Sequence, residues 1–325
     1  MEQITKSRVL GVDISVKRTT YAIVDIRGNV IAQDHFPTND YPNVNDYVSV
    51  LSEKIIMFTE ANGGYDTIRS VGISSPSGNY LTGCIENAPN LPWKGVVPLA
   101  AMLRDRLGLS VGLANDAYVT ALGEHAFGGA HGMRNFVIIS LGHGIGSCIF
   151  SNGEPHIGAN GFAGEIGHIC VKLDGRECGC GRFGCFEAYC AEKGIIATAQ
   201  ELMEQSDEDS LMRSLDELSP KTISQCCEKG DRMAIEVYRR TGLLLGRVMA
   251  AYATIADPEA IIFTGGISNA GKWLFDPAYE EFNRKMYPAP EGRIKFLTSA
   301  LNNRIRDVLG ASALAWGIKE YSLFK

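Results

Sequence analysis

The chain has 325 residues, of which 45% are hydrophobic and 21% are charged, and its formal net charge at pH 7 is −6. This length is long for a single hydrophobic core and predicts two domains. The acidic balance excludes the basic surface that nucleic-acid-binding and membrane-surface proteins use, and no apolar run is long enough to span a membrane. Because no export signal precedes the first expected strand, we expect a cytoplasmic protein that acts on a small molecule.

The first part of the chain predicts three strands and then strands that alternate with helices. Arg27-Gly28-Asn29 predicts a hairpin turn between two runs rich in β-branched residues. Apolar residues at three- and four-residue intervals predict the first helix. The expected elements are strands at 9–14, 19–26, 30–36, 68–74 and 111–114 and helices at 44–58, 99–107 and 117–127. This order is typical of a mixed sheet covered by helices.

The second part begins in a similar way. Asn152-Gly153 is a strong hairpin signal, Asp257-Pro258 ends a long apolar-striped helix, and Ser268 is a candidate helix N-cap. Residues 205–220 are acidic and predict an exposed loop with a helical turn. The expected elements are strands at 135–141, 147–150 and 260–264 and helices at 233–256 and 310–318. The repeated beginning predicts an internally duplicated α/β architecture.

One histidine and three closely spaced cysteines offer a complete ligand set for zinc. His168 is followed by Cys178, Cys180 and Cys185, and structural zinc sites are closed by four such nitrogen and sulfur ligands. The alternatives are core thiols or disulfides, but these cysteines lie among glycine and arginine, and a chain without an export signal stays in a reducing compartment. We interpret the other six cysteines as ordinary thiols: Cys84, Cys148, Cys170, Cys190, Cys226 and Cys227.

Asn115-Asp116 follows the expected strand at 111–114. Ligands bind at the carboxyl ends of strands in open α/β sheets, and a carboxylate there is a natural general base for a hydroxyl nucleophile. Both residue types are also common helix N-caps, and the local pattern leaves the two interpretations open. Glycine turns at 142–146, at 265–266 and at Gly310 bring backbone amides within reach of phosphates, although each alone indicates only tight geometry.

Taken in order, these motifs resemble the ROK family (repressor, open reading frame, kinase) over essentially the whole chain. The pair Gly164-Glu165-Ile166-Gly167-His168 and Cys178-x-Cys-Gly-x-x-Gly-Cys185-x-Glu187 is the most specific part. The other matching motifs are Asp13 with its hairpin, Ala88-Pro89-Asn90-Leu91-Pro92-Trp93, Asn115-Asp116, Gly142-x-Gly-Ile-Gly146, Asp257-Pro258, Gly265-Gly266 and Leu309-Gly310-Ala311.

The resemblance implies a duplicated actin-like, ribonuclease H-like α/β fold with a cleft between two domains. We expect the N-terminal domain to comprise residues 1–117 and 307–325 and the larger domain to comprise residues 118–306. The resemblance further implies zinc bound by the positions that match His168, Cys178, Cys180 and Cys185. Homodimers are common in the family, so we expect this chain to pair with a second copy.

Active members of the family transfer the γ-phosphate of ATP, with Mg²⁺, to a sugar hydroxyl, usually the 6-hydroxyl of a hexose. Asp116 matches the general base of the family. The residues that match sugar-binding positions are Asn90, Asn115, Glu165, His168 and Glu187. Those expected to contact nucleotide or phosphate are Asp13, Lys17, Gly142, His143, Gly144, Gly265, Gly266 and Gly310. The resemblance does not indicate which hexose or N-acetylhexosamine is used.

Three departures from the family pattern affect the phosphate and sugar loops. Ser15-Val16-Lys17 replaces a glycine-containing hairpin, His143 replaces a threonine, and Pro76-Ser77-Gly78 replaces Pro-Gly. Val16 would be strained at a positive φ. The leading hypothesis is an ATP-dependent sugar kinase, with Lys17 and His143 as donors to phosphate. The alternative is a catalytically weak sugar-binding regulator, without the N-terminal helix-turn-helix of the family's repressors, because the first strand begins within ten residues of Met1.

Overall fold

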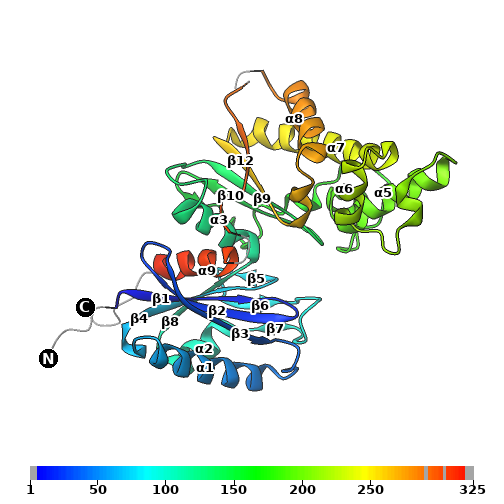
Figure 1. Cartoon of the computed structure of the whole chain (residues 1–325). Coiled ribbons are helices and arrows are strands. Elements are labelled where there is room, and N and C mark those ends of the chain that lie inside the picture. The colour runs from blue at the N-terminus through cyan, green and yellow to red at the C-terminus, as the bar shows by residue number, and fades with distance from the viewer. Residues whose placement is uncertain (1–5, 289–291, 303–304, 319–325) are drawn as a thin grey trace. The chain divides into compact units, whose positions relative to one another are not determined.

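The computed structural model describes residues 6–288, 292–302 and 305–318 and divides into two compact units (Figure 1). Unit 1 comprises Met1–Gly132, Ile157–Gly161 and Ala300–Lys325, and unit 2 comprises Met133–His156 and Phe162–Ser299. The sequence analysis placed the boundary after residue 117. In the structure it lies further along the chain, because α3 (Asp116–Phe127) packs against α9 (Arg306–Gly317) within unit 1. Residues 319–325 of the predicted first domain lie outside the described residues.

Unit 1 is built on a five-stranded sheet with the order β3-β2-β1-β4-β8. β1 pairs antiparallel with β2 and parallel with β4, and β8 continues the parallel side. The strands are β1 (Arg8–Ile14), β2 (Arg18–Asp25), β3 (Val30–Pro37), β4 (Ile68–Ser74) and β8 (Ser110–Ala114). A second, small antiparallel sheet contains β5 (Gly78–Asn79), β6 (Cys84–Glu86) and β7 (Val96–Val97).

Helices cover both faces of the main sheet of unit 1. On one face α1 (Val44–Ala61) and α2 (Leu99–Leu107) lie side by side, and α9, drawn in red in Figure 1, covers the other face. The approach of α9 depends on glycine in the strands, because a Cβ atom on Gly72 would lie 1.9 Å from the carbonyl oxygen of Ala311. The C-terminal helix is therefore an integral part of the N-terminal unit.

Unit 2 repeats the same strand order in β11-β10-β9-β12-β13. Here too the central strand pairs antiparallel on one side and parallel on the other. The strands are β9 (Phe136–Leu141), β10 (Ile145–Ser151), β11 (Glu154–Pro155), β12 (Ala260–Thr264) and β13 (Lys295–Thr298). The predicted duplicated α/β architecture is thereby confirmed.

The helices of unit 2 form its largest hydrophobic core together with the sheet. Buried residues of β9 and β12 pack with buried residues of α7, which also packs against α4, α5, α6 and, most extensively, α8. The helices are α4 (Glu187–Cys190), α5 (Glu192–Gln205), α6 (Pro220–Glu228), α7 (Arg232–Ala256) and α8 (Lys272–Lys285). No helix in the described part of the chain is long and apolar enough to cross a membrane.

The two predicted hairpins are confirmed, and the Asn152-Gly153 turn has the positive φ angles, 57° and 87°, that such a turn requires. The prediction of Ser268 as a helix N-cap is wrong. Ser268 lies inside the 3₁₀ turn η4 (Gly266–Ala270), where its hydroxyl donates to the Gly265 carbonyl at 2.6 Å, and α8 begins after Gly271. The predicted loop at 205–220 contains the expected helical turn, η3 (Leu211–Ser214).

Candidate active site

Unit 1 brings three carboxylates from separate elements into one electrostatic neighbourhood. Asp13 lies near the end of β1, opposite Ser74 of β4, and Asp116 is the first residue of α3. Asp307, in the first turn of α9, adds the third negative charge. No sequence pattern indicated Asp307, since its influence on Asp13 depends on α9 returning to the first sheet.

The surroundings of Asp13 disfavour its charged form. Burial and then the negative charge of Asp307 raise the pKa of Asp13 to about 7, and Asp116 adds to this effect. The Ser74 hydroxyl and the charge of Arg18 act in the opposite direction. At neutral pH the proton on Asp13 is therefore poised between bound and free, which is unusual for a structural carboxylate and typical of a functional site.

The sequence left open whether Asn115 and Asp116 cap a helix or serve catalysis, and the structure shows that Asn115 is the residue that caps the helix. Asn115 is the N-cap of α3, with its side chain accepting from the Tyr118 N–H at 2.8 Å. Asp116 accepts from the N–H of Ala117 at 2.8 Å, and its side chain remains accessible at the surface of the unit. Burial raises the pKa of Asp116, and the negative charge of Asp307 acts in the same direction.

The hairpin that follows Asp13 closes without glycine. The Ser15 hydroxyl bonds to the Arg18 carbonyl at 2.8 Å, and the backbone of Ser15 bonds to the same carbonyl at 3.0 Å. Neither Ser15 nor Val16 has a positive φ, so the strain considered for Val16 does not occur. The Lys17 side chain is exposed at this turn.

The two loops of unit 1 that were expected to contact sugar contain a left-handed residue and buried anchors. Ser77 takes the left-handed conformation, with φ of 55°, in the segment where the family pattern has glycine. Asn90 is exposed, while Leu91 and Trp93 on its C-terminal side are buried and the Trp93 indole donates to the Tyr41 carbonyl at 3.1 Å. The loop therefore presents Asn90 from a fixed base.

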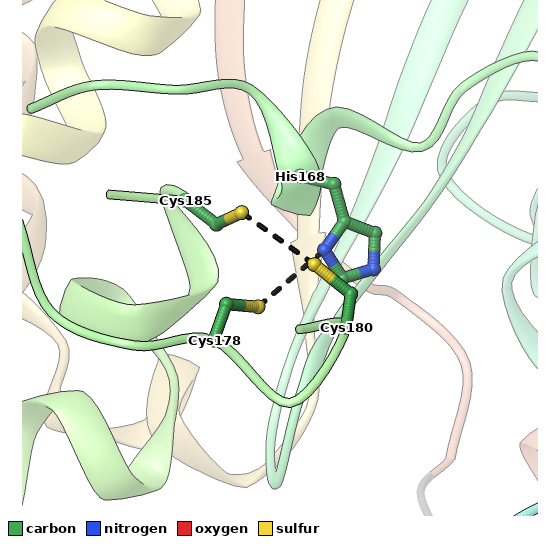
Figure 2. Close-up of side chains that lie close together, drawn as sticks. All are labelled: His168, Cys178, Cys180 and Cys185. Atoms are coloured by element: carbon green, nitrogen blue, oxygen red, sulfur yellow. Dashed lines mark hydrogen bonds between the residues drawn. The ribbon is translucent and has the colours of Figure 1, made fainter. Parts of the chain in front are cut away.

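Unit 2 brings the four predicted metal ligands together. The ligand atoms of His168, Cys178, Cys180 and Cys185 all lie within 4.8 Å of one another (Figure 2). His168 Nδ1 is 3.7 Å from Cys178 Sγ, and the sulfurs of Cys180 and Cys185 are 3.7 Å apart. All nine cysteines are free thiols. Three sulfurs and one imidazole in this arrangement fit a closed tetrahedral zinc site.

Two carboxylates stand next to the metal cluster. Glu165 Oε2 is 3.9 Å from His168 Nε2, the ring nitrogen that faces away from Cys178. Glu187 is the first residue of α4 and is half-buried; its Oε2 accepts from the Ile145 N–H at 2.8 Å, and its Oε1 is 3.7 Å from Cys178 Sγ. The cluster, Glu165 and Glu187 thus occupy one small region of unit 2.

A pocket of about 520 Å³ lies beside this region in unit 2. It contains three of the glycine-turn residues expected from the sequence, Gly142, His143 and Gly266. Gly144 and Gly265 flank these residues in the chain. The other lining residues were not predicted from the sequence. They come from α5, α6 with its N-cap, α7 and η4: Glu192, Ser219, Pro220, Lys221, Ser224, Gln225, Tyr238, Ile267, Asn269 and Ala270. Only the Ser219-Pro220 helix-start signal could have indicated α6.

The expected nucleotide contact at Gly310 is corrected by the structure. Gly310 is buried in the interior of α9, where a Cβ atom would lie 2.4 Å from the carbonyl oxygen of Val119 in α3. It therefore permits close packing of two helices instead of offering its backbone to a phosphate.

Comparisons with known proteins agree with this architecture. A model described as the ROK family matches residues 9–317. A glucokinase from Streptomyces coelicolor is 31% identical over 282 residues, which are 85% of this chain and 87% of the relative. The DNA-binding regulator NagC from Escherichia coli is 28% identical over 94% of this chain and 74% of its own length.

A solved structure extends the similarity to three dimensions. A ROK family glucokinase from Streptomyces griseus, in complex with glucose and AMPPNP, has a TM-score of 0.75 and 28% identity, with 95% of this chain and 99% of that chain covered. The expected actin-like fold is confirmed by such structural neighbours. The match of the family model over nearly the whole described chain, joined to this fold, shows that the chain belongs to the ROK family.

Proposed function

We propose that this chain is a kinase that transfers the γ-phosphate of ATP to a hydroxyl group of a hexose or N-acetylhexosamine. The observation that carries the proposal is Asp116, an accessible carboxylate with a raised pKa just beyond the carboxyl end of β8, whose charge also raises the pKa of Asp13. The similarity to glucokinases over most of their length supports the same reaction. The 6-hydroxyl is the proposed acceptor.

Asp116 is the proposed general base. A carboxylate whose pKa lies closer to neutral holds the proton of the attacking hydroxyl more effectively than an ordinary surface carboxylate. The Asn115 cap fixes the start of α3 and with it the position of Asp116. The remaining sugar hydroxyls are assigned to Asn90, Asn115, Glu165, His168 and Glu187, whose carboxylates, amides and ring nitrogen match hydroxyl donors and acceptors.

The pocket of unit 2 is the proposed site for the nucleotide. Backbone amides of the turns at 142–144 and 265–266 suit phosphate oxygens, and the His143 ring supplies a further donor. Lys17, exposed on the hairpin of unit 1, is also a proposed donor to phosphate. Mg²⁺, when bound, neutralises charge on the transferred phosphoryl group. Asp13 offers the oxygen ligand that this ion prefers, directly or through water.

Zinc is the proposed occupant of the cluster formed by His168, Cys178, Cys180 and Cys185. Because four protein ligands complete the coordination, the ion has a structural role and leaves no open position for a reacting water. Its effect on the chemistry is to orient His168, whose Nε2 faces away from the nearest thiol.

The test is consumption of ATP by zinc-loaded protein with Mg²⁺ against a panel of hexoses and N-acetylhexosamines. We expect sugar-dependent turnover, and we expect Asp116→Asn to reduce kcat by about 10²–10⁴, the usual contribution of a positioned base. Asp105→Asn, an exposed carboxylate on α2, is the control and should retain full activity. If Asp116→Asn retained full activity, the assignment of Asp116 as the general base would be wrong.

A sugar-binding regulator is the second candidate function. It is favoured by the departures at Ser15, Val16, Lys17 and His143 and by the similarity to NagC. Sugar binding in calorimetry without ATP turnover for any member of the panel would support this function against the kinase.

We also propose that the chain forms a homodimer. Multi-angle light scattering of the purified protein tests this directly, and a mass near 35.3 kDa, that of one chain, would contradict it.

A further inference from the structure

Carboxylates from two neighbouring helices hold the turn between β9 and β10. The N–H of Glu192, the first residue of α5, donates to the Gly142 carbonyl at 3.0 Å, and its carboxylate contacts the His143 ring. Glu187, the first residue of α4, accepts from the Ile145 N–H at 2.8 Å. The turn that borders the pocket is therefore held at both ends, by the first residue of α4 and by the first residue of α5.

The space beside the turn is filled by the Glu187 carboxylate. A Cβ atom on Gly144 would lie 2.6 Å from Glu187 Oε2, so only glycine leaves room for the carboxylate in this position. The shape of the turn and the position of Glu187 consequently depend on each other.

The other oxygen of the same carboxylate faces the metal cluster. Glu187 Oε1 lies 3.7 Å from Cys178 Sγ. Glu187 is also only two residues after the ligand Cys185, and the intervening Phe186 is fully buried. One oxygen of this side chain thus accepts from the Cys178 thiol and the other accepts from the Ile145 N–H of the glycine turn. When an ion takes the place of the thiol proton, the link from the cluster to Glu187 is the two-residue connection from Cys185.

We infer that Glu187 is a positioning residue that couples occupancy of the metal cluster to the conformation of the 142–145 turn, and so to the affinity of the pocket for nucleotide. The inference rests on the proposed function in taking this pocket as the nucleotide site. An ion bound by four ligands fixes the loop that carries Cys178 and Cys185. Glu187 is then held against the turn in advance, and the nucleotide binds a site that is already ordered.

This role makes a different prediction from a role in sugar binding. A side chain that contacts only sugar changes the affinity for sugar and leaves nucleotide binding in the absence of sugar unaltered. A side chain that orders the turn changes nucleotide binding when no sugar is present. The readout that separates the two roles is therefore the Kd of a nucleotide alone.

The experiment measures the Kd of a non-hydrolysable ATP analogue with Mg²⁺ by calorimetry, without sugar, for zinc-loaded and chelator-treated protein. For the wild type we expect chelation to weaken binding about 10-fold, within the usual range of coupling between sites. Glu187→Ala should weaken binding about 10-fold in the loaded protein, and chelation should then change Kd by less than about 2-fold. Zinc content is measured for each variant, so that lost coupling is distinguished from lost metal.

Glu192→Ala is the matched control, because Glu192 holds the same turn but has no contact with the cluster. It should weaken nucleotide binding and keep the full effect of chelation. Glu187→Gln retains an oxygen for the Ile145 N–H, so its Kd in loaded protein should stay within about 2-fold of the wild type. This comparison needs no metal removal, so equal binding by loaded Glu187→Ala and wild type would overturn the inference even if the chelated protein unfolds.

The inference is overturned if Glu187→Ala, loaded with zinc, binds the analogue as tightly as the wild type. It is also overturned if chelation weakens binding equally in the wild type and in Glu187→Ala. Absence of analogue binding by the loaded wild-type protein would be a different result, because it would reject the nucleotide site of the proposed function and the inference with it.

Discussion

At the end of β1, the pKa of Asp13 depends on carboxylates from two other elements. Burial, Asp307 of α9 and Asp116 of α3 all raise its pKa, to about 7. The ordinary value is 3.8, so the folded protein binds a proton that the unfolded chain releases between pH 4 and pH 7. Stability linked to Asp13 is therefore full below about pH 4, falls as the pH rises towards 7 and is constant above that value.

Asp13→Asn should remove this pH dependence. We expect the variant to be more stable than the wild type above pH 7, by about 1–3 kcal/mol after allowance for solvent screening, and equally stable below pH 4. Urea denaturation at a series of pH values, without ligands, measures the difference. If the free energy of unfolding depended on pH equally in Asp13→Asn and in the wild type, the raised pKa of Asp13 would be contradicted.

A second buried carboxylate behaves in the opposite way. Glu281 of α8 is 2% exposed and lies between Arg247 and Arg284, at 2.6 Å from each. Burial acts to raise the pKa of Glu281, but the hydrogen bonds from the two arginines outweigh it and leave the pKa below its usual value of 4.5. The stability linked to Glu281 is thus present above pH 4.5 and is lost as the pH falls through the lowered pKa.

Glu281→Gln should destabilise unit 2 by about 1–3 kcal/mol, because it weakens two charge-assisted hydrogen bonds of a buried group. Glu236 pairs with Arg239 and Arg240 in the same manner but is 29% exposed. Glu236→Gln should therefore cost less than about 1 kcal/mol. Urea denaturation at pH 7 measures the free energy of unfolding of the two variants. Equal decreases would show that burial does not determine how much each ion pair contributes to stability.

At the scale of elements, the sequence predicted those features whose residues lie close together along the chain. The four predicted metal ligands span 18 residues, from His168 to Cys185, so their spacing predicted the cluster. Asn115-Asp116 follows β8 directly, but its pattern left a helix cap and a general base open, and only the family resemblance assigned the base to Asp116. The pocket residues on α6 and η4 were missed because these elements meet only in the folded unit. Gly310 was misassigned for the same reason, since its neighbour Val119 is far away in sequence.

Two glycines of α9 provide a matched test of this packing. Gly310→Ala should destabilise the protein by about 1–3 kcal/mol, because the added methyl group would collide with the backbone of α3. Gly317, the last residue of the same helix, has no atom within 4 Å of an added Cβ. Gly317→Ala should stabilise the protein by up to about 1 kcal/mol through helix propensity. Thermal denaturation of both variants checks the signs, and a loss in both would contradict the packing argument.

At the scale of the whole molecule, each unit has its own hydrophobic core and its own chemistry. The core of unit 2 joins its sheet to α7 and α8, whereas the core residues of unit 1 surround the first sheet. The metal cluster belongs to unit 2 and the three carboxylates belong to unit 1. Domains with separate cores commonly unfold in separate transitions.

Differential scanning calorimetry should therefore show two transitions that respond to different treatments. Chelation of zinc should lower the midpoint of one transition, assigned to unit 2, by several degrees, since bound metal stabilises only the folded form. Asp13→Asn should raise the midpoint of the other at pH 8. A single transition moved by both treatments would show that the two units unfold together.

The place of α9 on the first sheet also sets the order in which the protein matures during translation. Residues from both ends of the chain, Val9, Val24, Val308 and Leu309 among them, share one hydrophobic cluster. At about 5–20 residues per second, the ribosome needs roughly 10–40 s to proceed from the end of α3 to the end of α9. During that interval one apolar face of the nascent N-terminal sheet has no cover. We therefore expect the growing chain to expose this apolar surface until α9 is made, and a product truncated before α9 to be prone to aggregation.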